Sequence, residues 1–442
     1  MFKLSKPEET DFYNETMDYL GPNETNTYYS VWQAIPRDIG KTKKPRVMAG
    51  SKAIINTLVE EGNEFDFAML KDGMPFFPGD PVIQVIGNKS NARKLEPKLL
   101  STLFYMTEIA SRAKEWTDAL GQDRVIDVGM RATAPGAWNF ATESFLIGGG
   151  KLTASTGVRN VPYLKEGIDY KLIGTTGHSL YLEYMTSGYN QREAFAMILD
   201  KFEAKNKGKP CALLVDTVDS KIGIDDALSV ILTQKKKTGQ THYMRLDSST
   251  PEFGLEAQAR YALENLISEI PDFKVIIEDG LTLETALEYE KAFEKAGLDP
   301  KKHILYGAGG AFVNNITRDN NGAWAYKPSV FKTLNFGKVP VVKLSSNPLK
   351  NSLAGLVGLS YDTTSSRLVS YDEKSSVNKV MTKDQLEIYM RKSLDELRSD
   401  AALYWTLVKD APNRWYESYD LDDNLKIMRE NAIAKTIQFG RN

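Results

Sequence analysis

The chain has one cysteine and three histidines among its 442 residues. A single cysteine, Cys211, excludes a disulfide framework within the chain and any cysteine-rich metal site. No apolar stretch approaches the roughly 20 residues that span a bilayer. The first residues show no apolar signal-peptide core, so we expect a cytoplasmic protein. Excess charge of one sign is also missing, with 56 basic against 58 acidic residues. We therefore expect neither nucleic acid nor membrane as a partner.

From about residue 122 the chain alternates short β-type runs with helix-like stretches. The runs are 124–129, 170–177, 211–219, 242–247, 273–280, 303–310 and 339–345. This alternation predicts a parallel sheet, which could close into an α/β barrel or stay open. Polar residues stand at the carboxyl end of nearly every run, and in a barrel these ends converge on one face. We therefore expect an irregular (distorted) α/β barrel over residues 122–345.

The two ends of the chain have a different pattern. Residues 74–87 predict β-structure with proline and glycine turns, 94–120 predict a long helix or a helix pair, and 383–442 are mostly helical and charged. We expect a second α+β domain, formed from residues 1–121 together with 346–442, that flanks the barrel.

The expected barrel mouth combines acids, bases and one histidine. Its members include Asp216, Asp219, Asp247, Asp279, Arg131, Arg245, Arg318, Lys343 and His178. The glycine-rich turn 307–310 lets backbone N–H groups approach an anion, and arginines pair with phosphate oxygens. Acids at such a mouth can hold magnesium or ribose hydroxyls. Together they point to a phosphorylated sugar and a divalent metal whose ligands the sequence leaves unknown.

Each of these residue types also has a structural explanation. The glycines can simply make a tight turn, and Asp216 or Asp219 can cap the next helix. His178 can be a hydrogen-bonded structural histidine, and Arg131 or Arg318 can belong to surface ion pairs. Single residues therefore leave both explanations open.

Several strings, taken in order, resemble one family. They are "TDFYNETMDY" (10–19), "PFFPGDPVIQVIG" (75–87), "DVGMRAT" (127–133), "GTTGHS" (174–179), "RLDSST" (245–250) and "YGAGGAFVNNITRDNNGAWAYK" (306–327). The set resembles the motifs of type II phosphoribosyltransferases of the nicotinate and nicotinamide group over roughly residues 1–355. This resemblance implies a distorted α/β barrel, a second domain from both chain ends, and a head-to-tail homodimer with shared active sites.

The resemblance also implies a reaction. Ribose 5-phosphate would pass from phosphoribosyl pyrophosphate to the ring nitrogen of nicotinate, or of nicotinamide as the nearest alternative, in NAD synthesis. Mg²⁺ would take part, and ATP would act as co-substrate because His178 matches the family histidine that ATP phosphorylates.

By the same resemblance the site residues have separate roles. Arg131 would lie beside the base, and Tyr13 of the partner subunit would stack on it. Arg245 and Asp247 would bind phosphate and ribose, Asp279 a ribose hydroxyl, and Asp216 and Asp219 would support the histidine and ribose. Gly309, Gly310 and Arg318 would hold the 5-phosphate or product phosphate.

Three positions depart from the family pattern. Val128 stands where the family usually has a phenylalanine, which removes one stacking surface. Lys151 stands where we align a family aspartate, and a lysine there favours an acidic base such as nicotinate. Ser249 replaces a glycine whose backbone could adopt positive φ.

Two other functions stay open from the residues. A magnesium-dependent barrel lyase or isomerase would use the acids at the strand ends, but the clustered arginines count against it. A non-catalytic sensor of phosphoribosyl ligands would explain the three departures, but it has little use for a phosphorylatable histidine.

Overall fold

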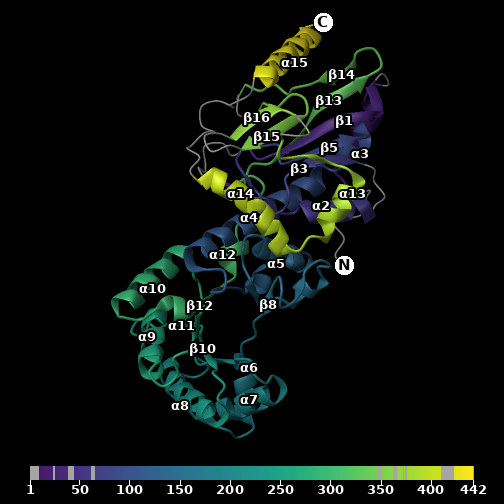
Figure 1. Ribbon diagram of the computed structural model, residues 1–442. Coiled ribbons are helices and arrows are strands. Elements are labelled where there is room, and N and C mark those ends of the chain that lie inside the picture. Colours follow the sequence, from purple (N-terminus) through teal and green to yellow (C-terminus); the bar gives the residue numbers. More distant parts are fainter. Residues whose placement is uncertain are drawn as a thin grey trace.

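The computed structural model describes residues 9–22, 25–37, 44–60, 65–346, 351–361, 366–371, 373, 376–409 and 423–441. Two sheets lie at opposite ends of the molecule (Figure 1). One is a seven-stranded parallel sheet, and the other is a six-stranded antiparallel sheet built from N- and C-terminal strands. The predicted fold class, an irregular α/β barrel with a second α+β unit from both chain ends, is confirmed.

The parallel sheet has the order β8-β7-β6-β12-β11-β10-β9. Its strands are β6 (Val125–Asp127), β7 (Leu152–Thr153), β8 (Lys171–Leu172), β9 (Ala212–Leu214), β10 (Tyr243–Leu246), β11 (Val275–Ile277) and β12 (Ile304–Ala308). A single bridge joins the two edges of the sheet, between Thr175 beyond β8 and Ala212 of β9. The amide of Thr176 donates to the carbonyl of Ala212 at 3.1 Å. The sheet thus curves into an irregular barrel whose last seam is short.

Six of the seven predicted runs contain these strands, and the seventh prediction is wrong. Residues 337–340 form β14 (Gly337–Pro340), which pairs with β13 (Ala325–Thr333) in the antiparallel sheet. The strand that fills the seventh place in the barrel is β7, only two residues long. It lies in the glycine-rich stretch after α5, where no β-type run is visible in the sequence.

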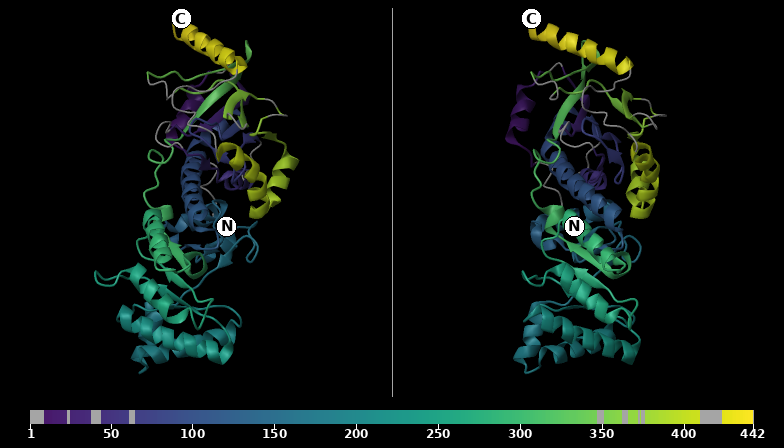
Figure 2. Two further views of the ribbon diagram at one scale, coloured as in Figure 1. Left: turned by 60° about the vertical axis from the view of Figure 1, so that its left-hand side comes forward. Right: turned by 90° about the vertical axis from the view of Figure 1, so that its left-hand side faces the viewer.

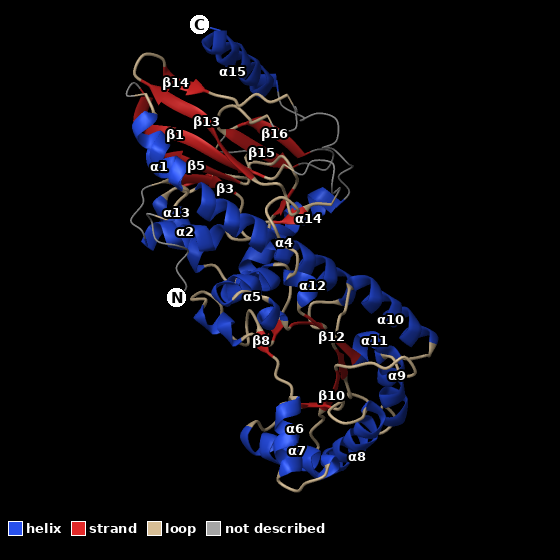
Figure 3. Cartoon of the chain, turned by 180° about the vertical axis from the view of Figure 1, so that it is seen from behind, coloured by secondary structure: helices blue, strands red, loops and turns tan. Residues whose placement is uncertain are grey.

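Helices surround the barrel strands (Figure 3). They are α5 (Trp138–Ile147), α6 (His178–Thr186), α7 (Gln191–Lys205), α8 (Ser220–Thr238), α9 (Leu255–Leu266), α10 (Leu283–Lys295), α11 (Pro300–His303) and α12 (Gly310–Val313), with short 3₁₀ turns η1 (Gly129–Ala132), η2 (Pro135–Ala137) and η3 (Thr156–Asn160). Thr282 caps α10, since its hydroxyl accepts from the amide of Thr285 at 3.1 Å.

The antiparallel sheet has the order β14-β13-β1-β5-β3-β17. Besides β13 and β14 it contains β1 (Thr25–Ile35), β5 (Ile83–Gly87), β3 (Asp66–Met69) and β17 (Val380–Met381). Two small antiparallel pairs lie near this sheet. They are β2 (Arg46–Val47) with β4 (Pro75–Phe76), and β15 (Val357–Tyr361) with β16 (Ser366–Ser370). A division of the chain at residues 121 and 345 stays a prediction. Strands β13 and β14 belong to the flanking sheet although they precede residue 345.

The remaining helices are α1 (Phe12–Leu20), α2 (Ser51–Glu60), α3 (Lys89–Lys94), α4 (Glu96–Leu120), α13 (Lys383–Arg391), α14 (Leu394–Lys409) and α15 (Asp423–Arg441). Helix α15 lies at the far end from the barrel (Figure 2). The described helices include none with the length and apolarity needed to cross a membrane.

Helix α4 connects the two halves of the molecule. The ring of Trp116 on α4 packs against Phe312 at 5.5 Å between centroids, and Phe312 contacts Phe145 of α5 at 5.1 Å. Where α4 ends, Arg124 donates to the carboxylate of Glu290 on α10 at 2.6 and 2.9 Å. These contacts hold the barrel against α4, the helix that connects it to the half of the molecule with the antiparallel sheet.

Helix α8 lies unusually close to the end of β9. A Cβ atom at Gly223 would stand 1.8 Å from the carbonyl oxygen of Val215, so only glycine allows this approach. The contact positions the chain just before Asp216.

Gly223→Ala should destabilise the fold because the methyl group forces α8 away from β9. Overpacking of this kind costs about 1–3 kcal/mol, which thermal or urea unfolding would detect. Gly254→Ala is the matched control, since no atom lies within 4 Å of a Cβ at Gly254. Equal stability of the two variants would contradict the close packing.

Candidate active site

The carboxyl ends of β6, β10, β11 and β12 surround a cavity of about 920 Å³, here called the mouth pocket. Its walls include Val128, Arg131, Asp247, Glu278, Asp279 and the backbone of 307–311. A smaller hollow of about 330 Å³ lies further inside the barrel and shares Val128, Arg131 and Glu278 with the mouth pocket. The structure thus brings together acids, an arginine and the glycine turn, as the barrel prediction requires.

Arg245, the third residue of β10, lies at the centre of this region with its side chain only 9% exposed. Its guanidinium donates to Asp247 at 2.6 Å and pairs with Glu278 at 3.0 Å. It also donates to the hydroxyl of Thr175 at 3.1 Å. One buried cation therefore ties the ends of β10 and β11 to the loop that follows β8.

Glu278 is a site residue that the sequence analysis missed. It follows β11 directly, is buried, and lines both the mouth pocket and the inner hollow. Burial raises the pKa of its carboxyl, although the Arg245 guanidinium opposes this effect. The sequence signal was the acidic pair at 278–279, from which we selected only the second member.

Asp279 is exposed and lines the mouth pocket, with a backbone φ of 77°. This left-handed conformation is uncommon outside glycine and asparagine or aspartate. It lets the two consecutive acids take different places, with Glu278 inside the barrel and Asp279 at the open side of the pocket.

The glycine turn after β12 permits a close approach of two strand ends. A Cβ at Gly309 would lie 2.9 Å from the carbonyl oxygen of Val128, and one at Gly310 would lie 2.6 Å from the amide nitrogen of Asn314. A Cβ at Gly307 would collide with the side chain of Glu278 at 2.4 Å. Side chains at these positions would collide with the neighbouring strand end, Asn314 or Glu278, so the glycines allow the close packing of this pocket wall.

His178 begins α6 on the side of the barrel where β8 and β9 meet. Its Nδ1 lies 3.2 Å from the Thr217 hydroxyl, and its Nε2 lies 3.9 Å from a carboxylate oxygen of Asp216. The histidine side chain is 47% exposed, while that of Asp216 is 2% exposed. Both oxygens of Asp216 are buried without a hydrogen-bond partner in the described chain. A buried carboxylate beside an accessible imidazole can orient it or balance its charge.

Asp219 has the structural role that the sequence left open. It is exposed and caps α8, its carboxylate accepting from the amide of Ile222 at 2.8 Å. This contact gives the residue a structural role, and its catalytic role stays a prediction.

Lys151 and Lys343 do not reach the mouth. Lys151 precedes β7, and its carbonyl accepts from the amide of Lys171 at the amino end of β8, so it lies at the opposite end of the strands. Lys343 follows β14 in the flanking half, because run 339–345 is not a barrel strand. The substrate-binding roles of both lysines stay predictions.

Arg318 and Tyr13 are also outside the mouth pocket within this chain. Arg318 forms an exposed pair with Asp319 at 2.9 Å, although Asn314 and Asn315 of the same segment line the pocket. The Tyr13 hydroxyl donates to Glu96 on α4. A role for Tyr13 in a partner's site stays a prediction.

Two of the departures have a simple structural outcome. Val128 lines the mouth pocket, so an aliphatic side chain stands in the pocket wall where the family usually has a phenylalanine. Ser249 does not have positive φ, so the backbone at this position does not need glycine.

Among the described residues no three histidine, cysteine, aspartate or glutamate side chains group to form a metal site. Asp247 and Asp279 both line the mouth pocket. This arrangement suits Mg²⁺, which is commonly held by one or two carboxylates together with substrate phosphates.

The profile of the nicotinate phosphoribosyltransferase (NAPRTase) family matches residues 140–395. A nicotinate phosphoribosyltransferase of Bacillus subtilis is 26% identical over 296 residues, covering 65% of this chain and 53% of that protein. One from Mycobacterium tuberculosis is 28% identical over 200 residues, covering 44% of this chain and 40% of that protein. The chain thus aligns with about half or less of these relatives.

Two solved structures share the fold at low identity. Human nicotinic acid phosphoribosyltransferase superposes with a TM-score of 0.64 at 15% identity, covering 96% of this chain and 99% of that one. Nicotinate-nucleotide pyrophosphorylase from Pyrococcus furiosus also gives 0.64, at 18% identity over 91% of this chain and 96% of that one.

Glu278→Ala should destabilise the protein because it removes one partner of a buried ion pair. We expect a loss of about 3 kcal/mol in the free energy of unfolding, at the lower end of the usual range, since Arg245 keeps Asp247 as a partner. Urea unfolding measures the difference. Asp279→Asn, a change at the exposed neighbour, serves as the control and should stay within about 0.5 kcal/mol of the parent. A Glu278→Ala variant as stable as this control would refute the central position of the ion pair.

Proposed function

Because the chain belongs to the nicotinate phosphoribosyltransferase family, we propose that it transfers ribose 5-phosphate from phosphoribosyl pyrophosphate to the ring nitrogen of nicotinate. The products are nicotinate mononucleotide and pyrophosphate, for NAD synthesis in the cytoplasm. The observation that carries this proposal is the mouth pocket, where Arg131, two carboxylates bound to Arg245 and the open glycine turn face one cavity.

The reaction needs both signs of charge in one place. Pyrophosphate leaves from C1 of the ribose, so negative charge grows on the leaving group and positive charge on the sugar. Preorganised groups around such charges lower the barrier because they need no rearrangement during the reaction. Asp247 and Glu278 would face the sugar, and Arg245 would position both of them.

The remaining groups of the mouth would bind the substrates. The backbone at Gly309 and Gly310 would approach the 5-phosphate, with Arg318 approaching from the adjacent segment. Asp279 would hold a ribose hydroxyl. Mg²⁺, held by Asp247 and Asp279 with the phosphates, would neutralise the leaving pyrophosphate.

The preference for nicotinate rests on Arg131 rather than on Lys151. Arg131 is exposed at the junction of the mouth pocket and the inner hollow. A guanidinium pairs with a carboxylate through two parallel hydrogen bonds, which nicotinamide cannot offer. Tyr13 of a partner subunit would cover the base in a homodimer, next to Val128.

His178 would couple ATP hydrolysis to the transfer. A neutral imidazole is a competent nucleophile toward phosphorus, and the exposed ring is accessible to ATP. Buried Asp216 would hold the ring from behind. Asp219 would contribute only by capping α8 and so fixing this loop.

The purified chain should form nicotinate mononucleotide from phosphoribosyl pyrophosphate, Mg²⁺ and nicotinate. Nicotinate, nicotinamide and quinolinate are offered separately, with and without ATP, and the mononucleotide and pyrophosphate are measured by mass spectrometry. Formation from nicotinamide alone would contradict the assigned base. No product from any base, with binding of phosphoribosyl pyrophosphate intact, would indicate a sensor instead of an enzyme.

His178→Ala should abolish ATP stimulation and any phosphorylated protein while basal transfer continues, because the mouth pocket does not include this side chain. Rates with and without ATP, and ³²P incorporation from labelled ATP, measure the two effects. Ser179→Ala, at the exposed neighbouring position, is the control. Undiminished ATP coupling in His178→Ala would remove the role given to this histidine.

A further inference from the structure

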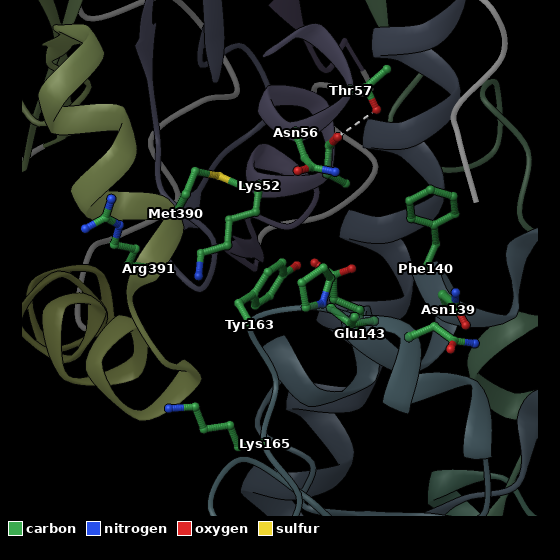
Figure 4. Close-up of a pocket in the computed structure, with 14 residues that line it drawn as sticks. Lys52, Asn56, Thr57, Asn139, Phe140, Glu143, Tyr163, Lys165, Met390 and Arg391 are labelled. Atoms are coloured by element: carbon green, nitrogen blue, oxygen red, sulfur yellow. Dashed lines mark hydrogen bonds between the residues drawn. The ribbon is translucent and has the colours of Figure 1, made fainter. Parts of the chain in front are cut away.

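A second cavity of about 380 Å³ lies away from the barrel mouth (Figure 4). Its walls come from α2, α5, the segment after η3, and α13, which are distant from one another in the sequence. No residue that lines it also lines the mouth pocket or the inner hollow. Its size falls within the usual range for small-molecule sites, about 300–1,000 Å³.

Two polar groups on the wall of this cavity lack hydrogen-bond partners. Glu143 of α5 is 4% exposed, and its Oε1 atom is buried without a partner among the described residues. The same holds for the hydroxyl of Tyr163, which follows η3. Figure 4 shows both side chains directed into the same space. Buried polar atoms are nearly always satisfied in folded proteins, so this pair points to a bound molecule.

The nearby cation does not need an anionic ligand. Lys52 is fully buried and donates to the carbonyl of Lys392, and its ammonium lies 4.1 Å from the centre of the Tyr163 ring. Asp72 contributes opposite charge from behind. Its carboxylate is itself satisfied by the amides of Ser51 and Lys52 and by the hydroxyl of Tyr389.

Glu143 is best described as a neutral acid. Burial, reinforced by Asp72 and opposed by Lys52, raises the pKa of its carboxyl to about 8. The raised pKa favours the protonated carboxyl, which presents an O–H donor beside a carbonyl acceptor. Lys165 and Arg391 also line the cavity, but both are exposed, and Arg391 pairs with Glu387. At the buried floor Lys52 lies near Asp72, so a charged ligand would lose hydration there without a free counter-charge.

We propose that this second cavity binds a small uncharged molecule through a primary carboxamide. The carboxamide oxygen accepts from the acid group of Glu143, and one amide N–H donates to its carbonyl oxygen, so that two parallel hydrogen bonds form. The Tyr163 hydroxyl supplies a third. Phe140 and Met390 give the apolar surface for the rest of the ligand. Because α2, α5 and α13 all contribute, a bound carboxamide also holds the two halves of the molecule together.

Benzamide is the direct probe, with benzoate and benzylamine as its anionic and cationic counterparts. Each is titrated into the full chain at pH 7 by calorimetry, and the shift in unfolding temperature is recorded in parallel. We expect saturable binding and stabilisation with benzamide alone. Tighter binding of benzoate or benzylamine, or no binding of any probe, overturns the proposal.

Substitutions at Glu143 locate the binding and test its chemistry. Glu143→Leu removes both hydrogen bonds and should weaken benzamide binding at least about tenfold. Glu143→Gln keeps a hydrogen-bond donor beside an acceptor and should therefore retain benzamide binding. Loss in both variants would show that a donor beside an acceptor at this position is not sufficient and would contradict the paired hydrogen bonds of the carboxamide.

Two controls separate this cavity from the mouth. Arg131→Ala should leave benzamide binding unchanged, and Glu143→Leu should leave turnover of nicotinate unchanged. The opposite pattern would place the benzamide at the mouth and refute the second site. Should Glu143→Leu fail to fold, Tyr163→Phe provides the test, since loss of one hydroxyl should weaken binding several-fold without disturbing the fold.

Discussion

The arrangement of the strand ends at the barrel mouth depends on one buried guanidinium. Arg245 binds Asp247 after its own strand, Glu278 after β11, and Thr175 in the loop that closes the barrel. Removing one partner of a buried ion pair leaves an unbalanced charge at high cost. The same contacts therefore stabilise the barrel seam and hold the two carboxylates beside the mouth pocket. If the mouth pocket binds the substrate as proposed, stability and substrate geometry are linked at this position.

The other chemically distinctive groups are the places where folding leaves polar atoms without partners. Both carboxylate oxygens of Asp216 are buried without a partner beside His178, and in the second cavity one oxygen of Glu143 and the hydroxyl of Tyr163 are buried without a partner among the described residues. Such conflicts between local polarity and burial are expected chiefly at functional sites. In the first case a histidine is within reach, and in the second a neutral acid faces a cavity. The proposals made for the two places follow from this difference: phosphoryl transfer at the exposed histidine and ligand recognition in the cavity.

The sequence predicted the barrel because alternation and polar strand ends follow from how parallel strands are built. It could not identify β7, since two residues show no periodicity. It assigned 339–345 to the barrel because a short apolar β-type run has the same pattern in parallel and antiparallel sheets. Lys343 was therefore expected at the barrel mouth as well. Glu278 was missed because only the turn at Asp279, with φ of 77°, decides which acid points inward. The second cavity has no local motif, since its walls come from four distant segments.

Binding of phosphoribosyl pyrophosphate to Arg245→Lys tests the central claim most directly. A lysine keeps the charge but cannot serve three partners at fixed angles, so calorimetry with Mg²⁺ should show affinity lower by at least about tenfold. Arg260→Lys is the control, because the Arg260 side chain is 45% exposed and, within the described part of the chain, its ion pair is with Glu256 on its own helix. Unfolding temperatures establish that both variants are folded. Unchanged affinity in a folded Arg245→Lys variant would contradict the account.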